Sequence, residues 1–184
     1  MLFQGRSRPV IGLDITTSSI KLIELSRSGD GYRVESYAAE PSPPNAINEK
    51  AIVDSQAVGE AVRRAVKRAG ARSKECAVAI SGDAAITKVI QMPRNLREAE
   101  LESQVEMQAD QYIPFPMEEV SFDFEVIGPS EKDPEMLDVL LVATRSENVE
   151  QRQAAVQSAG LATRIVDVEA FALENACRLL THQM

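Results

Sequence analysis

The segment from Gly12 to Lys21 constrains the fold more than any other part of this sequence. It reads Gly-Leu-Asp-Ile-Thr-Thr-Ser-Ser-Ile-Lys and lies between apolar residues 10–14 and an apolar-polar alternation over residues 20–26. Apolar, β-branched stretches on both sides of a Ser/Thr-rich turn are typical of a β-hairpin. The sequence therefore predicts two strands, with Asp14 ending the first and Lys21 near the start of the second.

The predicted turn carries groups that suit a phosphate. Clustered backbone N–H groups, hydroxyls and one cation can bind phosphate oxygens, and a nearby carboxylate can position a hydrated Mg²⁺. The segment supplies all of these, from Asp14, Thr16, Thr17, Ser18, Ser19 and Lys21. The Gly-x4-Gly-Lys pattern of a Walker loop is missing. On spacing alone, a purely structural hairpin remains the alternative.

The rest of the chain alternates strand and helix patterns. A third strand over residues 32–40 completes a meander, and a helix over residues 55–69 ends at Gly70. Strands are predicted over residues 76–81, 86–92, 120–127, 137–144 and 161–168, and helices over residues 97–113, 146–159 and 169–180. This order, βββ-α-β, then β-α-β-β, then α-β-α, predicts an α/β (α+β) fold with mixed sheets.

Composition and charge limit the classes of partner. The chain is 44% hydrophobic, yet it has no run of the roughly 20 apolar residues that a membrane span requires. A cytoplasmic protein without a membrane span is expected. Residues 1–90 hold 13 basic and 10 acidic residues, whereas residues 91–184 hold 7 and 18. An acidic second half disfavours nucleic acid and favours a basic or amphipathic protein partner.

Residue types that support covalent or metal chemistry are scarce. Cys76 and Cys177 are far apart, which predicts two buried or half-buried thiols rather than a disulfide or zinc site. His182 is the one histidine, so no Ser-His-Asp or Cys-His system is available, and no catalytic residue is predicted. Asp123 and Glu125 share a strand face, as the two carboxylates of a paired-carboxylate catalyst would, but nothing in the sequence indicates a pocket beside them, so no catalytic role is assigned to them.

The first eight residues are left out of the fold prediction. Leu2-Phe3-Gln4-Gly5 resembles the remnant of a protease-cleaved tag and is equally compatible with a native N-terminus. Residues 1–8 are therefore expected to be disordered or tag-derived.

Several segments together resemble one protein family. The strand–Asp–Ser/Thr turn–Ile–Lys pattern is similar to the first phosphate loop of the superfamily of actin, sugar kinases and Hsp70 chaperones. A closer resemblance is to the PilM family, an actin-like, FtsA-like family of type IV pilus assembly. It rests on residues 12–15, 19–25, 43–46, 109–116, 118–120 and 166–174, in family order. The Tyr-Ile-Pro-Phe-Pro block at residues 112–116 is the most specific of them.

The resemblance implies an architecture and a nucleotide site. Residues 9–82 and 139–184 would form an actin-like (RNase H-like) subdomain 1A, and residues 83–138 an inserted FtsA-type β-α-β-β subdomain 1C. ATP would be held by Gly12, Asp14, Thr16, Thr17, Ser18, Ser19, Lys21 and Glu169, with Asp14 near Mg²⁺. The alternative for Glu169 is an acid at a helix start that the helix dipole favours.

The resemblance also implies a partner. PilM-type proteins lie at the cytoplasmic face of the bacterial inner membrane, bind the N-terminal cytoplasmic tail of PilN between subdomains 1A and 1C, and link it to the motor side for twitching motility. Tyr112, Ile113, Pro114, Phe115, Pro116 and Phe122 would contact that peptide. The alternative is core packing where proline ends a helix.

The length departs from the family pattern. PilM proteins are about twice as long as this chain, and the remaining half carries the second phosphate loop. The ATP site would then be half built, and no enzymatic activity is expected, with at most weak ATP hydrolysis at full length. An exposed lobe surface would also favour a homodimer or a domain swap. The alternatives are a fragment of an actin-superfamily ATPase or sugar kinase, and the cytoplasmic domain of a GspL-like type II secretion protein.

Overall fold

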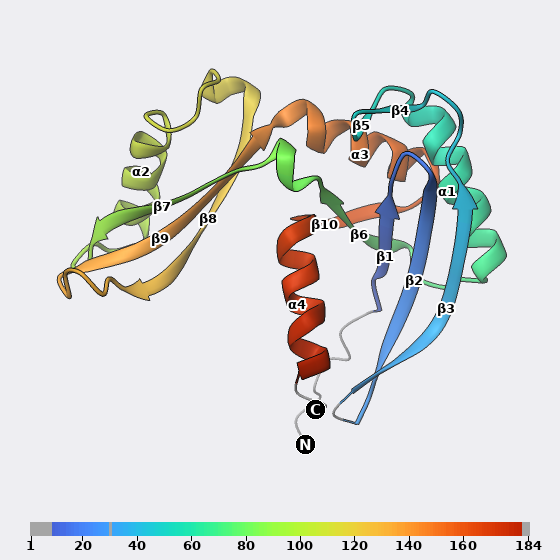
Figure 1. Ribbon diagram of the computed structural model, residues 1–184, viewed down its shortest axis with the longest axis horizontal. Coiled ribbons are helices and arrows are strands. Elements are labelled where there is room, and N and C mark those ends of the chain that lie inside the picture. The colour runs from blue at the N-terminus through green and yellow to red at the C-terminus, as the bar shows by residue number, and fades with distance from the viewer. Residues whose placement is uncertain (1–8, 30, 182–184) are drawn as a thin grey trace. The chain divides into compact units, whose positions relative to one another are not determined.

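The computed structural model describes residues 9–29 and 31–181, in two compact units (Figure 1). Unit 1 comprises residues up to Ser81 together with those from Glu150 onward, and unit 2 comprises Gly82–Val149. The expectation for residues 1–8 falls outside the described residues.

Unit 1 is built on a mixed sheet. Its described strands are β1 (Ile11–Ile15), β2 (Ser19–Ser28), β3 (Gly31–Pro41), β6 (Glu75–Ile80) and β10 (Ala162–Val168), in the spatial order β10-β6-β1-β2-β3. The first three strands pair antiparallel, which confirms the predicted meander. Strand β6 pairs parallel with both β1 and β10. The carboxyl ends of these three parallel strands therefore lie at one edge of the sheet.

One face of this sheet packs against two helices. Helix α1 (Ser55–Ala69) begins after Asp54, whose side chain accepts a hydrogen bond from the Ala57 backbone N–H, and ends at Gly70 with φ 65°. Helix α3 (Ser146–Ser158) begins in the last residues of unit 2, continues into unit 1 and contributes Ala155 and Val156 to the core of unit 1. The strands turn alternate residues toward these helices, including Ile11, Leu13, Ile20, Leu22, Cys76 and Val78. The bounds of α1 match the prediction, and its cap signals are local in sequence.

A short hairpin in unit 1 was not predicted. Strands β4 (Ile47–Asn48) and β5 (Ala51–Ile52) pair across the two-residue turn Glu49–Lys50. Both turn residues have positive φ, 45° and 69°, as a type I′ turn requires. The sequence did not predict it because neither turn residue is the glycine or asparagine that this turn favours.

The opposite face of the same sheet, here called the outer face, turns away from α1. Gly12, Asp14 and Lys21 alternate with the core residues of β1 and β2 and so lie on this face. Helix α4 (Glu169–Thr181) follows β10 and contacts β10 and β6. Its side chains from 169 to 179 are exposed except for the half-buried Phe171.

Unit 2 is a three-stranded antiparallel sheet with one helix. The strands are β7 (Ile86–Pro93), β8 (Val120–Pro129) and β9 (Met136–Arg145), in the order β7-β9-β8. Helix α2 (Glu98–Ala109) packs on one face, and two 3₁₀ turns lie at Gly82–Ala84 and Met117–Glu119. The core gathers side chains from β7, α2 and β9, chiefly Ile90, Met92, Leu101, Val105, Val139 and Leu141.

Two predicted boundaries in unit 2 differ from the structure. The predicted division at residue 138 falls inside β9, whereas unit 2 continues to Val149, because β9 is the central strand that pairs with both β7 and β8. The helix predicted to Ile113 ends at Ala109. Pro114 disfavours a helical backbone at the preceding residue, so the chain leaves the helix one turn early.

Candidate functional site

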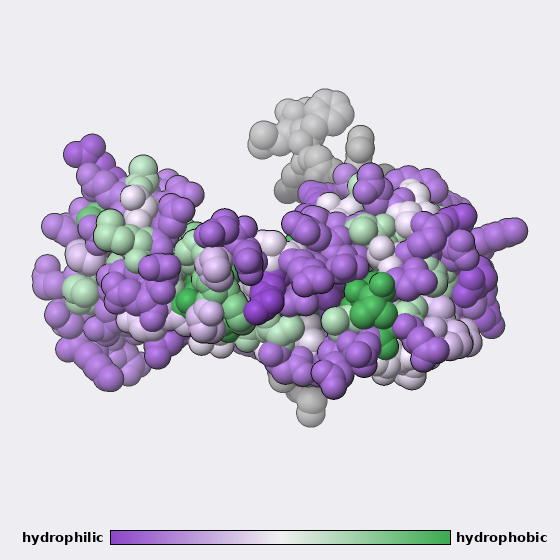
Figure 2. Space-filling view, turned by 90° about the horizontal axis from the view of Figure 1, so that it is seen from above, coloured by the Kyte–Doolittle hydropathy of each residue, from purple (hydrophilic) through white to green (hydrophobic). Residues whose placement is uncertain are grey.

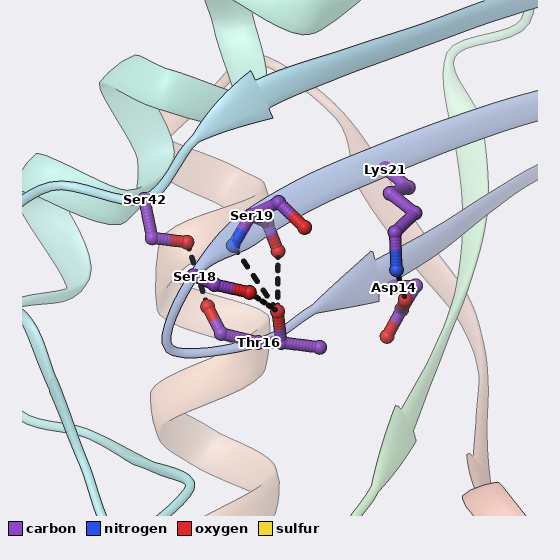
Figure 3. A network of polar contacts seen from close by, with 6 residues as sticks. All are labelled: Asp14, Thr16, Ser18, Ser19, Lys21 and Ser42. Atoms are coloured by element: carbon purple, nitrogen blue, oxygen red, sulfur yellow. Dashed lines mark hydrogen bonds and ion pairs between the residues drawn. The ribbon is translucent and has the colours of Figure 1, made fainter.

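The β1–β2 turn is closed by the side chain of Thr16. The Thr16 backbone N–H donates to the Ser19 carbonyl at 3.0 Å. The Thr16 hydroxyl donates to the same carbonyl at 2.8 Å and accepts from the Ser19 N–H at 3.1 Å (Figure 3). The Thr16 and Ser19 groups are thus used inside the turn.

A second segment holds the turn from outside. The Ser42 hydroxyl donates to the Thr16 carbonyl at 2.6 Å, and the Ser42 N–H donates to the Ser18 carbonyl at 3.2 Å. The exposed residues at the tip are Thr17 and Ser18. The turn is therefore a fixed loop whose two tip residues remain accessible to a ligand.

Asp14 and Lys21 form an ion pair beside this turn. They are cross-strand partners, and the Lys21 ammonium donates to Asp14 Oδ2 at 2.8 Å, with both side chains about half exposed. The hydrogen bond to Asp14, and then its charge, raise the pKa of Lys21. The pair lies apart from the hydroxyl network in Figure 3. Because Lys21 is already paired with Asp14, a phosphate would compete with the Asp14 carboxylate for the Lys21 ammonium.

Asp167 is a site candidate that the sequence analysis missed. It pairs with Ala79 of β6, and continuing the β1–β6 register by one residue places Asp14 on the other side of Ala79. All three residues alternate with buried neighbours and so share the outer face. Two strand spacings, about 10 Å, separate the two backbones. The pairing of β10 with β6 creates this juxtaposition, which no local pattern indicates.

Glu169 begins α4 directly after β10, at the carboxyl edge of the parallel strands. Its charge acts on Arg152 of α3, which is 3% exposed. Burial lowers the pKa of Arg152, and the carboxylate of Glu169 opposes that effect. Glu169 is therefore electrostatically linked to a buried cation and also occupies the favourable N-terminal end of a helix.

The described residues contain no group of three or more His, Cys, Asp or Glu side chains arranged to hold a metal ion. Asp14 and Asp167 are two carboxylates on one face of the sheet and do not make up such a group. Both cysteines are free; Cys76 is buried, as expected, whereas Cys177 is exposed, which corrects the expectation for that residue. Burial raises the pKa of the Cys76 thiol to about 11. A thiol with that pKa is protonated at neutral pH and unreactive.

The residues predicted to contact a peptide all lie in unit 2, with unequal exposure. Tyr112 is 41% exposed, and the Lys88 ammonium lies 5.3 Å from its ring centre. The Arg145 guanidinium lies 4.2 Å from the ring centre of Phe115, which is half-buried. Pro114, Pro116 and Phe122 complete the set; the two prolines are exposed and Phe122 packs against the core.

Ile113 corrects one expectation. It is 5% exposed and its side chain packs in the core of unit 2, so it does not lie on the surface where a peptide could contact it. The accessible part of the Tyr-Ile-Pro-Phe-Pro block is therefore Tyr112 and the two prolines.

Seen from above, both units are covered mainly by hydrophilic residues (Figure 2). Among the described residues, no helix is both long and apolar enough to cross a membrane.

Comparison with known proteins decides the family. A sequence model of the family described as type IV pilus assembly protein PilM matches residues 12–184. This chain belongs to the PilM family. The expected actin-like α/β fold is confirmed as well, by the likeness to the solved structures described next.

Two solved structures are similar to this PilM-family chain. A PilM–PilN type IV pilus biogenesis complex contains a chain 31% identical to it, with a TM-score of 0.80, covering 91% of this chain and 49% of that one. The PilM-family chain thus spans about half the length of that relative. The cytoplasmic domain of EpsL, an inner-membrane component of the type II secretion system of Vibrio cholerae, is 13% identical, with a TM-score of 0.56. It covers 86% of this chain and 57% of the EpsL chain, and shows the shared fold.

Proposed function

We propose that this chain is a type IV pilus assembly adaptor that binds the N-terminal cytoplasmic tail of a PilN-type protein. One observation carries the proposal: the chain is 31% identical over most of its length to a PilM protein solved in complex with PilN. As an adaptor it would act at the cytoplasmic face of the inner membrane, join other pilus inner-membrane or motor components, and catalyse no reaction of its own.

The Tyr112 region of unit 2 has the chemistry of a peptide-binding surface. An exposed aromatic ring beside a cation, flanked by two exposed prolines, offers apolar contact without flexible side chains. The buried Ile113 and the half-buried Phe115 fix the backbone of this block. Such a rigid aromatic anchor is the kind of residue that carries most of the binding energy at an interface.

Replacing Tyr112 by alanine is expected to weaken binding of a PilN N-terminal peptide about tenfold, the effect of losing one aromatic anchor. Isothermal titration of the peptide into the folded chain measures it. Met107→Ala is the matched control, because Met107 is 70% exposed on the same unit. Equal affinities of the Tyr112 and Met107 variants would place the peptide elsewhere, and no binding to the folded wild-type chain would refute the adaptor proposal.

The proposal includes a half-site for ATP and Mg²⁺ on unit 1. Supporting it are the fixed β1–β2 turn with its accessible Thr17 and Ser18, the cation of Lys21, and Asp14 and Asp167 on the same face. Gly12 lies on this face two residues before Asp14, and a Cβ there would lie 3.2 Å from Ile23 Cγ2. These residues would bind phosphate oxygens and orient a hydrated metal.

We expect weak binding of ATP–Mg²⁺, which Lys21→Met reduces about fivefold by removing the one cation at the turn. Equilibrium dialysis with ATP is the measurement, and Lys67→Met, on the exposed side of α1, is the control of equal charge. If the two variants bind ATP equally, the half-site assignment is wrong.

Self-association is part of the same proposal. Strand β3 is an edge of the unit 1 sheet and places Tyr32, Val34 and Tyr37, each more than half exposed, on its outer side. Unpaired edges and exposed apolar side chains both favour pairing with a second copy. A dimer mass by light scattering is the expected result.

A further inference from the structure

The sheet of unit 2 has a helix on one face only. In β9, Val139, Leu141 and Ala143 enter the core beneath α2, so Leu140 and Val142 lie on the opposite face, here called the open face. Val89 of β7 pairs with Leu140 and is 50% exposed. The middle of the open face is therefore an apolar row of Val89, Leu140 and Val142.

Charge on the two faces of this sheet is segregated. The described residues of the three strands contain two cations, Lys88 and Arg145, and both lie on the α2 face, against Tyr112 and Phe115. The charged side chains on the open face are all carboxylates. Asp123 pairs with Val142 and Glu125 pairs with Leu140. Asp138 lies on β9 two residues before Leu140 and so on the same face.

The open face thus presents an apolar row flanked on one side by two exposed carboxylates, about one strand spacing away. Both edges of the sheet, β7 and β8, are unpaired in unit 2. An anionic membrane surface or a nucleic acid would be repelled by these charges. A protein segment that alternates apolar and basic residues would match the row and the carboxylates at once.

We infer that the open face is a docking surface for a basic, amphipathic segment of a partner protein. The apolar row supplies contact area and the carboxylates set orientation and rate of encounter. This surface lies across the sheet from Tyr112, so the inference goes beyond the binding of a PilN tail and does not depend on it.

A labelled short peptide of alternating leucine and lysine tests the inference by fluorescence anisotropy with the full chain. Asp123→Asn with Glu125→Gln is expected to weaken binding about fivefold, because it removes two partly exposed charge pairs with the peptide lysines. The matched control, Glu102→Gln with Glu106→Gln, removes the same charge from exposed positions on α2 and should change the affinity less than about twofold. Val89→Ser, which leaves the charge unaltered, should also weaken binding.

The outcomes separate docking from general attraction between opposite charges. Equal losses from the two charge-matched pairs, with no effect of Val89→Ser, would mean non-specific attraction and overturn the inference. The absence of peptide binding by the folded wild-type chain would overturn it too. A selective loss at the open face, with PilN-peptide affinity unchanged, supports it.

Discussion

Replacing Gly59 by valine is expected to destabilise unit 1 by about 4 kcal/mol, and replacing it by alanine by about 2 kcal/mol. Gly59 lies where α1 meets α3, and a Cβ at this position would approach the Ala155 carbonyl oxygen at 2.6 Å and Ser158 Oγ at 2.5 Å. The carbonyl belongs to the backbone of α3, so the helices would have to move apart. This cost exceeds the roughly 1 kcal/mol that a better helix former contributes.

Thermal or urea unfolding followed by circular dichroism measures the loss. Arg64→Val, on the exposed side of α1, is the control for the lower helix propensity of valine, and we expect less than about 1 kcal/mol there. Adding Ser158→Gly to Gly59→Ala removes the side chain that the new Cβ would meet and should recover part of the stability. A Gly59→Val variant as stable as Arg64→Val would contradict the close approach of the two helices.

Replacing Arg152 by leucine is expected to lower the free energy of unfolding by about 3 kcal/mol, because it removes a buried guanidinium that donates to two backbone carbonyls. Arg152 Nε donates to the Ala79 carbonyl at 2.8 Å, and Nη2 donates to the Lys50 carbonyl at 3.2 Å. Lys50 and Glu49 both have left-handed backbone conformations, which cost free energy unless the surroundings hold them. Arg152 thus ties α3 to the end of β6 and to the strained β4–β5 turn.

Two further variants sharpen this prediction. Arg152→Lys retains the charge but has no planar fork to reach both carbonyls, so an intermediate loss is expected. Arg164→Leu removes a half-exposed arginine that pairs with Glu75 at 3.1 Å, and it should cost less than about 1 kcal/mol. Denaturant midpoints compare the three, and equal midpoints for Arg152→Leu and Arg164→Leu would show that Arg152 holds neither carbonyl.

The candidate site was predictable only where its residues are neighbours in sequence. Asp14 and Lys21 face each other because a short turn joins β1 to β2, and that geometry follows from a Ser/Thr-rich segment between two apolar ones. Asp167 lies about 150 residues further along, and only the pairing of β10 with β6 brings it beside Ala79. Likewise, the pattern of residues 109–116 predicted a helix stop, but not that Ile113 would turn inward while Tyr112 stays exposed.

The sequence alone determined the features that depend on local backbone preferences. These are the meander of β1–β3, the bounds of α1 with its Gly70 cap, and the hairpin from Gly12 to Lys21, because capping, turn chemistry and alternation act over a few residues. The tertiary structure decided which distant segments meet. It placed β9 at the centre of unit 2, Gly59 against α3, and Arg152 beneath the β4–β5 turn. Burial and long-range pairing select these contacts, and neither has a signature within a short window of sequence.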